Sequence, residues 1–483
     1  MVTRSMRPLR GVVVVALLAA ASLAHALPVT LKDSNGTAYN VNTQVVPLNS
    51  LSNASGALTD ATFLKPVTVT VYYVGFTPFF GFLTTYTTQH QVNVPLRPAF
   101  GDHSVNPPVG GFNSLIIAAV NGQKLVNPLV FNPGQALAGQ DCPDSNGKNK
   151  ELVFASQPFP AQNLTLTRKV YVPSNQEWAR WVNIVTNTGP APTQVAIVLL
   201  GLIGSTNNTY VVTTSTGDNV LTTEDLWFTT AQKVPQGTNS TEPSIGYVVQ
   251  GPGATTPVAN LGISTTSSPP GKAAFSYIPT IPPGGSAVVM TFVTVQGKSK
   301  AAKSTISDIV TTPLPSSAIK CIPEQQLSQI VNFAHITPPT LKNATVKLKF
   351  NKTNQDTAQW KGKITVGAGI NLNGLPVTVN LGGVVQNFIL KKNGSANNGG
   401  GNKFNLPANL KKGVTVAGTY NFSFNLKGDL QTQLAQYGLT NADAGNAAVS
   451  IPLTMTAGPG EYAVDQPFTY NATAGKSGTA KTS

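Results

Sequence analysis

Charged side chains are scarce in this 483-residue chain, because Lys, Arg, Asp and Glu together make up only 10% of it. The surface helices of globular proteins normally carry many Glu and Lys residues, so a mainly helical fold is disfavoured. The polar residues that are abundant, Thr, Ser and Asn, suit the exposed faces of strands and turns. With 41% hydrophobic residues the chain can also bury a core, which argues against disorder. We therefore expect an all-β protein.

Cysteine is almost absent, with Cys142 and Cys321 as the only two in the chain. Two thiols so far apart either form a disulfide across a long loop, which requires an oxidising compartment, or stay buried and separate. The sequence leaves both alternatives open.

Long apolar runs are missing except for one near the start, from Val12 to Ala24. Three arginines precede it and the small-residue pattern Ala24-His25-Ala26 follows it. The run is too short to cross a bilayer, and this layout is typical of a signal peptide that is cleaved after Ala26. No cysteine lies directly after that position to carry a lipid. We expect an exported protein, extracellular or associated with the cell envelope, without a transmembrane anchor.

The expected mature chain is moderately basic, since removal of residues 1–26 leaves 29 basic and 18 acidic residues and a net charge of +11. Such a charge favours anionic partners, for example an anionic polysaccharide or another envelope polymer. Lys and Arg are not gathered into a dense tract with interleaved aromatics, so nucleic acid is not expected as a partner. A plain solubilising charge is the competing interpretation.

Short β-branched runs bounded by Gly, Pro and Asn predict a large antiparallel β-sandwich domain over residues 27–336. The pattern changes within 300–333, where Ile306, Ile309 and Val310 have helical spacing, as do Leu327 and the apolar residues after it. We expect two short helices, at 301–310 and 323–331, that close the domain. The runs expected to form strands here are 67–74, 89–94, 115–120, 164–172, 181–186, 194–200, 210–214, 246–250 and 287–295.

Strand-like runs return after residue 340 and predict a second, smaller β-sandwich over 340–475. The pair Asn393-Gly394 lies between two of them and suits a tight turn. Residues 476–483 are small and polar, and we expect a disordered tail. The runs expected to form strands in this domain are 345–350, 361–366, 376–380, 384–391, 403–406, 420–426 and 448–456.

Several segments of the sequence have a recognisable phrasing: Lys347–Lys352, Trp360–Lys363, Pro376–Val384 and Phe468–Ala472 in the second domain, and Arg168–Pro173, Trp181–Gly189 and Ile330–Phe333 in the first. With these segments the second domain resembles an immunoglobulin-like β-sandwich module of exported bacterial surface proteins, most without an assigned activity. The first domain resembles the large supersandwich-type domains that accompany that module, and also the sandwiches of sugar mutarotases and polysaccharide lyases. The resemblance implies architecture and export and supplies no catalytic residue.

The residues that could bind a metal ion fit the known patterns of metal sites poorly. The histidines nearest to one another, His90 and His103, are thirteen residues apart, which does not suit a zinc site. The segment 141–151 gathers oxygen ligands as calcium prefers, but its register does not fit an EF-hand and its lysines oppose a cation. We expect no metal or other cofactor and treat this segment as a polar turn. The four calcium candidates are Asp141, Asp144, Asn146 and Glu151.

Acidic residues near tryptophan suggest sugar binding, because sugar rings stack on indole while their hydroxyls bind carboxylates. Asp218, Glu224 and Asp225 precede Trp227, which we expect to be the more exposed tryptophan. Glu177 lies beside Trp178 and Trp181, and Trp181 is expected in the core because it belongs to an alternating strand. Trp227 and Asp218 are therefore the predicted glycan-binding residues.

Two functions remain open. The first is a non-enzymatic exported protein that serves as an adhesion or scaffold module or binds glycans. The alternative is a carbohydrate-active enzyme, a polysaccharide lyase or glycoside hydrolase, with Glu224, Asp225 and either His90 or His103 as acid and base. The enzyme requires at least two of these groups to face each other in one cleft.

Overall fold

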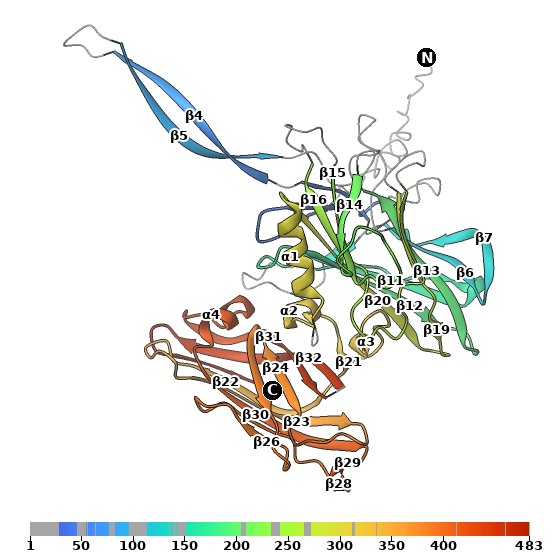
Figure 1. The fold of residues 1–483 in the computed structure, drawn as a ribbon, viewed down its shortest axis with the longest axis vertical. Coiled ribbons are helices and arrows are strands. Elements are labelled where there is room, and N and C mark those ends of the chain that lie inside the picture. The colour runs from blue at the N-terminus through green and yellow to red at the C-terminus, as the bar shows by residue number, and fades with distance from the viewer. Residues whose placement is uncertain are drawn as a thin grey trace, which may run out of the picture.

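The structure is a computed structural model that confirms an all-β protein with few, short helices (Figure 1). We refer to residues 29–296 as the N-terminal part, to 299–337 as the connector and to 340–482 as the C-terminal part. The structure describes residues 29–45, 55, 57–62, 64–76, 83–95, 114–134, 136–138, 142, 151–203, 209–232, 242–264, 272–311, 314–334, 336–411, 413–458 and 460–482.

Two antiparallel sheets form the body of the N-terminal part. In spatial order the first contains β14 (Thr209–Thr214), β15 (Trp227–Gln232), β16 (Ser244–Val248), β20 (Ser286–Gln296), β12 (Ala179–Asn187), β11 (Leu164–Tyr171), β9 (Glu151–Phe154) and β8 (Ala136–Ala138), with β10 (Gln157–Phe159) on β11. The second contains β17 (Asn260–Ser264), β18 (Lys272–Tyr277), β13 (Thr193–Leu202), β6 (Ser114–Val120) and β7 (Gln123–Val130), with β19 (Thr280–Ile281) on β13.

Smaller strand groups complete this part. A three-stranded sheet contains β1 (Val29–Lys32), β2 (Ala38–Val41) and β3 (Leu58–Thr62), and β4 (Leu64–Phe76) pairs with β5 (Leu83–Pro95) as a long hairpin. Figure 1 shows the hairpin projecting from the body.

The central strands β12 and β20 are apolar on both faces, and the structure shows why. One face packs in the core between the two sheets, where Trp181 is fully buried as predicted. The other face, which includes Val182, Met290 and Phe292, packs against the connector. A sheet covered on both sides requires near-continuous apolar strands, and 10 of the 11 residues of β20 are buried.

In the described part of the connector there are three helices, and the sequence predicted two of them. Helix α1 (Ser299–Ile309) buries Ile306 and Ile309 against the sheet, and α3 (Glu324–Leu327) begins directly after Pro323. Helix α3 ends four residues before the predicted end at 331, and helix α2 (Ser316–Ile319) was not predicted.

The C-terminal part is a single sheet that curls round to enclose its own core. Its spatial order is β25 (Val384–Ile389), β24 (Pro376–Leu381), β31 (Ala444–Ala457), β32 (Gly460–Thr473), β33 (Ser477–Lys481), β22 (Thr340–Leu348), β23 (Asp356–Val366), β30 (Gly418–Gly428), β27 (Lys403–Asn405) and β26 (Ser395–Asn397), with β21 (Ile336–Thr337) on β32. A separate pair, β28 (Leu410–Lys411) and β29 (Val414–Thr415), and helix α4 (Gln431–Leu434) complete it.

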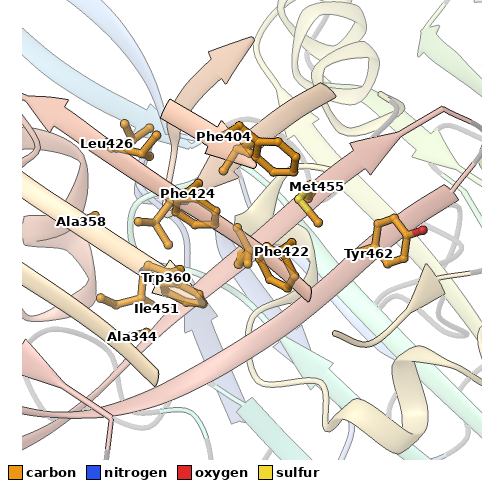
Figure 2. Close-up of a cluster of buried hydrophobic side chains, with 14 of the residues drawn as sticks. Ala344, Ala358, Trp360, Phe404, Phe422, Phe424, Leu426, Ile451, Met455 and Tyr462 are labelled. Carbon is orange, nitrogen blue, oxygen red and sulfur yellow. The ribbon is translucent and has the colours of Figure 1, made fainter. Parts of the chain in front are cut away.

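Strict alternation explains this shape. In β23 every second residue is buried, so the sheet has one apolar face that must be covered by the sheet itself. Trp360 lies in this core beside Phe424, and their ring centroids are 5.8 Å apart (Figure 2). The Trp360 ring is also 5.5 Å from that of Phe468. The two ends of the sheet approach each other, and the Asn398 amide beyond β26 donates to Gln386 Oε1 of β25 at 3.0 Å.

The prediction that residues 476–483 form a disordered tail is wrong. Residues Ser477–Lys481 form β33, which lies between β32 and β22 and pairs with both. Small residues fit there because the neighbouring strand is close: a Cβ on Gly478 would lie 2.2 Å from the Tyr470 hydroxyl oxygen. The small, polar residues of this segment therefore belong to a strand with little space around it, and not to a disordered terminus.

Candidate functional site at the connector

The acidic residues predicted for sugar chemistry do not face each other. Asp225 is fully buried, and its carboxylate accepts hydrogen bonds from the backbone N–H of Thr222 at 2.9 Å and from the hydroxyl of Thr216 at 3.0 Å. Burial raises the pKa of Asp225, but these hydrogen bonds outweigh that effect and the pKa is lowered. Glu224, the residue before it, is exposed and lines a separate cavity of about 430 Å³. Asp225 thus stabilises its loop.

The predicted glycan-binding pair is also placed differently. Trp227 is only 8% exposed, because it packs on the connector side of the sheet with Lys303 Nζ 5.8 Å from its ring centroid. Trp227 is more exposed than Trp181, as expected, but an indole that is 8% exposed offers a sugar ring no open stacking surface. Asp218 is exposed, but Oδ1 accepts hydrogen bonds from the Thr214 hydroxyl and from the N–H of Val220, as a turn residue does.

The remaining candidates are only partly described. His90 belongs to β5, but its side chain lies outside the described residues, as does all of His103. Asp141, Asp144 and Asn146 are outside them as well. Glu151, the fourth calcium candidate, is fully buried and its Oε1 lies 3.3 Å from Arg180 Nη2, so its carboxylate already serves a buried ion pair. No cluster of three or more His, Cys, Asp or Glu that could hold a metal occurs within the described ranges.

The residues that the structure does bring together lie where the connector meets the N-terminal part. Cys142 and Cys321 form a disulfide across a sequence separation of 179, with their Cα atoms 5.3 Å apart. Beside it, Arg180 of β12 donates from Nη1 to the carbonyl oxygens of Ala318 at 2.6 Å and Lys320 at 2.8 Å. Two fully buried charges, Arg180 and Glu151, thereby hold the same segment as the disulfide.

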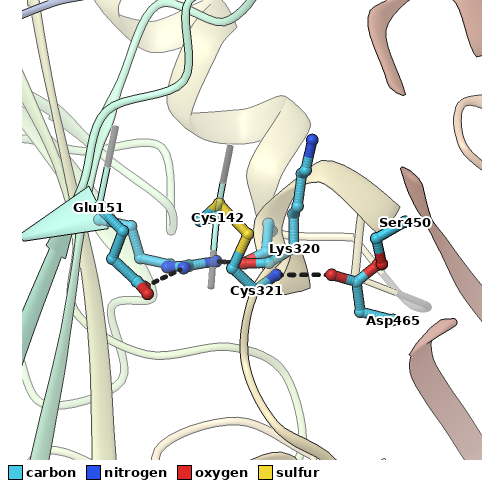
Figure 3. Close-up of a disulfide and its surroundings, with 8 residues drawn as sticks. Cys142, Glu151, Lys320, Cys321, Ser450 and Asp465 are labelled. Atoms are coloured by element: carbon cyan, nitrogen blue, oxygen red, sulfur yellow. Dashed lines mark hydrogen bonds and ion pairs between the residues drawn. A yellow bond between two sulfur atoms is a disulfide. The ribbon is translucent and has the colours of Figure 1, made fainter. Parts of the chain in front are cut away.

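The connector is also bound on its other side, by the C-terminal part. The N–H of Cys321 donates to Asp465 Oδ2, and the N–H of Leu314 donates to Glu461 Oε1, both at 2.8 Å. Lys320 Nζ lies 4.9 Å from the centroid of the Tyr437 ring. Figure 3 shows the disulfide between Glu151 on one side and Asp465 on the other.

Cys321 holds an unusual backbone conformation at this point, with φ of +65°. A residue with a Cβ adopts this left-handed conformation at a cost of roughly 1–2 kcal/mol. The disulfide and the hydrogen bond to Asp465 hold it there from two directions. The short segment from Leu314 to Cys321 is therefore fixed by both β-rich parts at once.

A cavity of about 650 Å³ opens beside this segment. Glu177 is half-buried in it: its Oε2 accepts from the Gln296 amide at 2.9 Å and the Thr305 hydroxyl at 3.3 Å, while Oε1 accepts no hydrogen bond from any described residue. Asp308 supplies a second carboxylate, and the other polar lining residues are Ser34, Asn175, Gln176, Ser304 and Ser317. Hydroxyls, amides and carboxylates in this combination can bind the hydroxyl groups of a sugar.

The sequence showed Glu177 beside Trp178, but it did not predict the charged residues that contact the connector. Arg180 stands in the apolar run Trp178–Val185, and a charge in such a run is the signal that could have identified it. Trp178 is itself only 2% exposed, so it supports the wall of the cavity and offers no stacking surface.

Comparisons with known proteins do not assign the chain to a family. No protein-family model matches the chain, and no curated protein matches it. Solved structures to which the chain has a weak likeness include a polysaccharide lyase (8% identity, TM-score 0.27, covering 82% of this chain and 46% of the lyase) and the Slr1438 protein of Synechocystis sp. PCC 6803 (11% identity, TM-score 0.25, covering 57% and 99%). A third is a candidate aldose 1-epimerase from Klebsiella pneumoniae (10% identity, TM-score 0.24, covering 51% and 87%).

TM-scores this low indicate no function. The chain also spans less than half the length of the lyase. Among the described residues, no helix has the length and apolar character needed to span a membrane.

Proposed function

We propose that this chain is an exported, non-enzymatic protein of the cell surface or exterior, in which the connector fixes two β-rich parts as a rigid scaffold. The observation that carries the proposal is the double attachment of the segment from Leu314 to Cys321. One side is held by a disulfide and by Arg180, the other by Asp465 and Glu461.

The disulfide supports the export half of the proposal. A bond between distant cysteines forms and persists in oxidising compartments, which agrees with the signal peptide expected from the sequence. The described acids support the non-enzymatic half, because Asp225 is committed to its loop and Glu224 does not face it.

Expression of the full chain in a bacterium tests the export half. We expect the exported fraction to contain a chain that begins at Leu27, with no free thiol when it is denatured without reductant. An uncut chain that stays in the cytosol with two free thiols would contradict it. Mass spectrometry of the N-terminus and thiol labelling make both measurements on one sample.

We further propose that the scaffold binds a polysaccharide in the 650 Å³ cavity. Among the described residues its lining contains the carboxylates of Glu177 and Asp308 and no Lys or Arg, so neutral or amino sugars suit this cavity better than anionic ones. The basic surface elsewhere would serve for contact with an anionic envelope polymer.

A glycan array probed with the mature chain tests the cavity directly. We expect Glu177→Gln to lose about tenfold in apparent affinity for the retained glycan, because a charged hydrogen-bond partner is removed. The matched control is Glu224→Gln, an exposed carboxylate outside this cavity. Equal binding by both variants would disprove the site, and a loss with Glu224→Gln alone would favour the second, smaller cavity.

A further inference from the structure

The positive charge of the chain is concentrated in its C-terminal part. Residues 340–483 contain 14 lysines, no arginine and 5 acidic residues, which gives a net charge of +9. Residues 27–339 contain 15 basic and 13 acidic residues, a net charge of only +2. A charge that served solubility alone would be spread over both parts with the two signs interspersed. The uneven distribution therefore favours the C-terminal part as the contact for an anionic partner.

Six of these lysines lie on the outer face of the C-terminal sheet, and we call this surface the lysine face. Each is exposed and alternates along its strand with residues buried in the core, so its side chain points outward. The strands that carry them, β33, β22, β23, β30 and β27, are consecutive in the sheet. At about 4.8 Å between neighbouring strands they cover roughly 19 Å of the surface. The six are Lys347, Lys361, Lys363, Lys403, Lys427 and Lys481.

No negative charge balances the lysine face. The only acidic residue in the five strands is Asp356, which is fully buried and accepts hydrogen bonds from the backbone N–H groups of Lys349 and Leu430. None of the six lysines forms an ion pair with a residue that the structure describes. Figure 1 shows β23 and β30 on the side of the C-terminal part that lies away from the N-terminal part. The lysine face is therefore open to an external partner.

Uncharged polar side chains lie between the lysines. Lys361 is paired in register with Asn343 of β22 on one side and with Ser423 of β30 on the other. Lys347 likewise lies between two threonines, one of β23 and one of β33. Amides and hydroxyls of this kind form hydrogen bonds with sugar hydroxyls, while the ammonium groups attract anionic groups. The lysine face thus offers contacts to both kinds of group that an acidic polysaccharide carries.

Two other roles of such a surface fit the structure less well. Lysines on edge strands prevent pairing with another chain, but all five strands here have a neighbour on both sides. Single-stranded nucleic acid stacks its bases on exposed aromatic side chains. The aromatic side chains of these strands, such as Trp360 and Phe424, are buried in the core. The lysine face has charge and hydrogen-bonding groups but no stacking surface for bases.

We propose that the lysine face binds a linear acidic polysaccharide. Lysine makes point contacts with single anionic groups, and the absence of arginine from residues 340–483 disfavours bidentate recognition of one tightly held group. Several weak contacts along one polymer add up to stable binding. This inference names the surface for the envelope contact in the proposed function, and it rests on that part of the proposal. It is independent of the cavity around Glu177.

Calorimetric titration of the purified mature chain with sodium polygalacturonate tests the lysine face. We expect binding in dilute buffer, no binding of neutral dextran, and loss of binding in 1 M sodium chloride, where the Debye length is only about 3 Å. The test variant combines four substitutions on the lysine face: Lys347→Gln, Lys361→Gln, Lys363→Gln and Lys481→Gln. It should lose affinity by about tenfold or more, because four of the six charges are removed.

The matched control variant removes four exposed lysines from turns of the same part and has the same net charge as the test variant. It should keep the affinity of the parent chain. Both variants should also keep the parent Tm, since substitutions at exposed positions change stability little. The control substitutions are Lys352→Gln, Lys391→Gln, Lys392→Gln and Lys476→Gln.

Equal affinities of the two variants would overturn the proposal, as would the absence of binding by the parent chain in dilute buffer. A short DNA duplex that binds more tightly than polygalacturonate would replace the polysaccharide by nucleic acid as the partner. Glu177→Gln should bind polygalacturonate like the parent chain, and a loss with this variant would place the polymer in the cavity instead. Because the purified chain is used, a failure of export contradicts the proposed function without changing this result.

Discussion

The N-terminal and C-terminal parts both have an all-β core, but they differ in the charges they bury and in how their apolar sheet faces are covered. Among the described residues the C-terminal part buries only two charged side chains, Asp356 and Glu461, and one of these contacts the connector. The N-terminal part buries seven: Asp33, Glu151, Arg168, Lys169, Arg180, Asp225 and Glu242. The C-terminal sheet covers its own apolar face, whereas the nine-stranded N-terminal sheet requires the connector to cover its second face.

The difference shows what each part depends on. A self-covering sheet is stabilised mainly by apolar packing around Trp360. A sheet covered by a separate segment depends on the attachment of that segment, which here is the work of Arg180, Glu151 and the disulfide. Four perturbations separate these dependences.

The largest effect is expected from Trp360→Ala. Removal of a fully buried indole leaves a cavity at the centre of the C-terminal core and costs about 4–5 kcal/mol. Denaturant unfolding should show the C-terminal transition shifted, with the fluorescence of the N-terminal tryptophans changing at nearly the same denaturant concentration as before. Val385→Ala, which alters an exposed position of the same sheet, is the control. A uniform shift of both transitions would mean that the two parts do not differ in this way.

Glu151→Gln comes next and acts on the N-terminal part. It leaves Arg180 as an uncompensated buried charge, which costs about 3–4 kcal/mol. Glu224→Gln, on an exposed acid, should leave stability unchanged within error. If both variants unfold at the same urea concentration as the parent chain, the ion pair does not stabilise this part.

The disulfide should contribute somewhat less. Replacement of Cys142 and Cys321 by serine removes a cross-link over 179 residues and is expected to lower the free energy of unfolding by about 2–4 kcal/mol. The loss should appear in the transition of the N-terminal part and leave the Trp360 region unaffected. Calorimetry of the oxidised chain and the double variant makes this comparison, and coincident traces would contradict the proposed attachment.

The smallest effect concerns pH. Burial raises the pKa of Glu461 from 4.5 to about 7, with the Leu314 N–H bond opposing the rise. The folded chain therefore holds this proton at pH values where the unfolded chain has released it. Stability is greatest below about pH 4.5 and falls by on the order of 2 kcal/mol as the pH rises to about 7. Glu461→Gln should flatten this part of the stability profile, and an unchanged slope would exclude Glu461 as its source.

The fold was predictable where pattern alone decides it. Period-two alternation identified β23, an apolar and β-branched run identified β12, and Pro323 marked the start of α3. The disulfide was left open because two cysteines 179 residues apart carry no information about their distance in space. The role of β33 was missed because its residues are small and polar, and only the neighbouring Tyr470 reveals why they must be.

The candidate site was less predictable, for a physical reason. Acids close to Trp227 in sequence suggested a binding surface, but Asp225 faces its own loop and Trp227 faces the connector. The cavity around Glu177 combines residues from three distant segments, and the contacts of Arg180 cross from β12 to the connector. Proximity along the chain does not indicate which distant residues come into contact in the fold.

The central claim is that the connector is held from both sides, and hydrogen exchange of two amides tests it most directly. The N–H groups of Leu314 and Cys321 donate to carboxylates of the C-terminal part, next to the disulfide of the N-terminal part. In the oxidised chain we expect both amides to exchange slowly, and in the chain with both cysteines replaced by serine to exchange at least tenfold faster. Equal rates in the two chains would contradict the account.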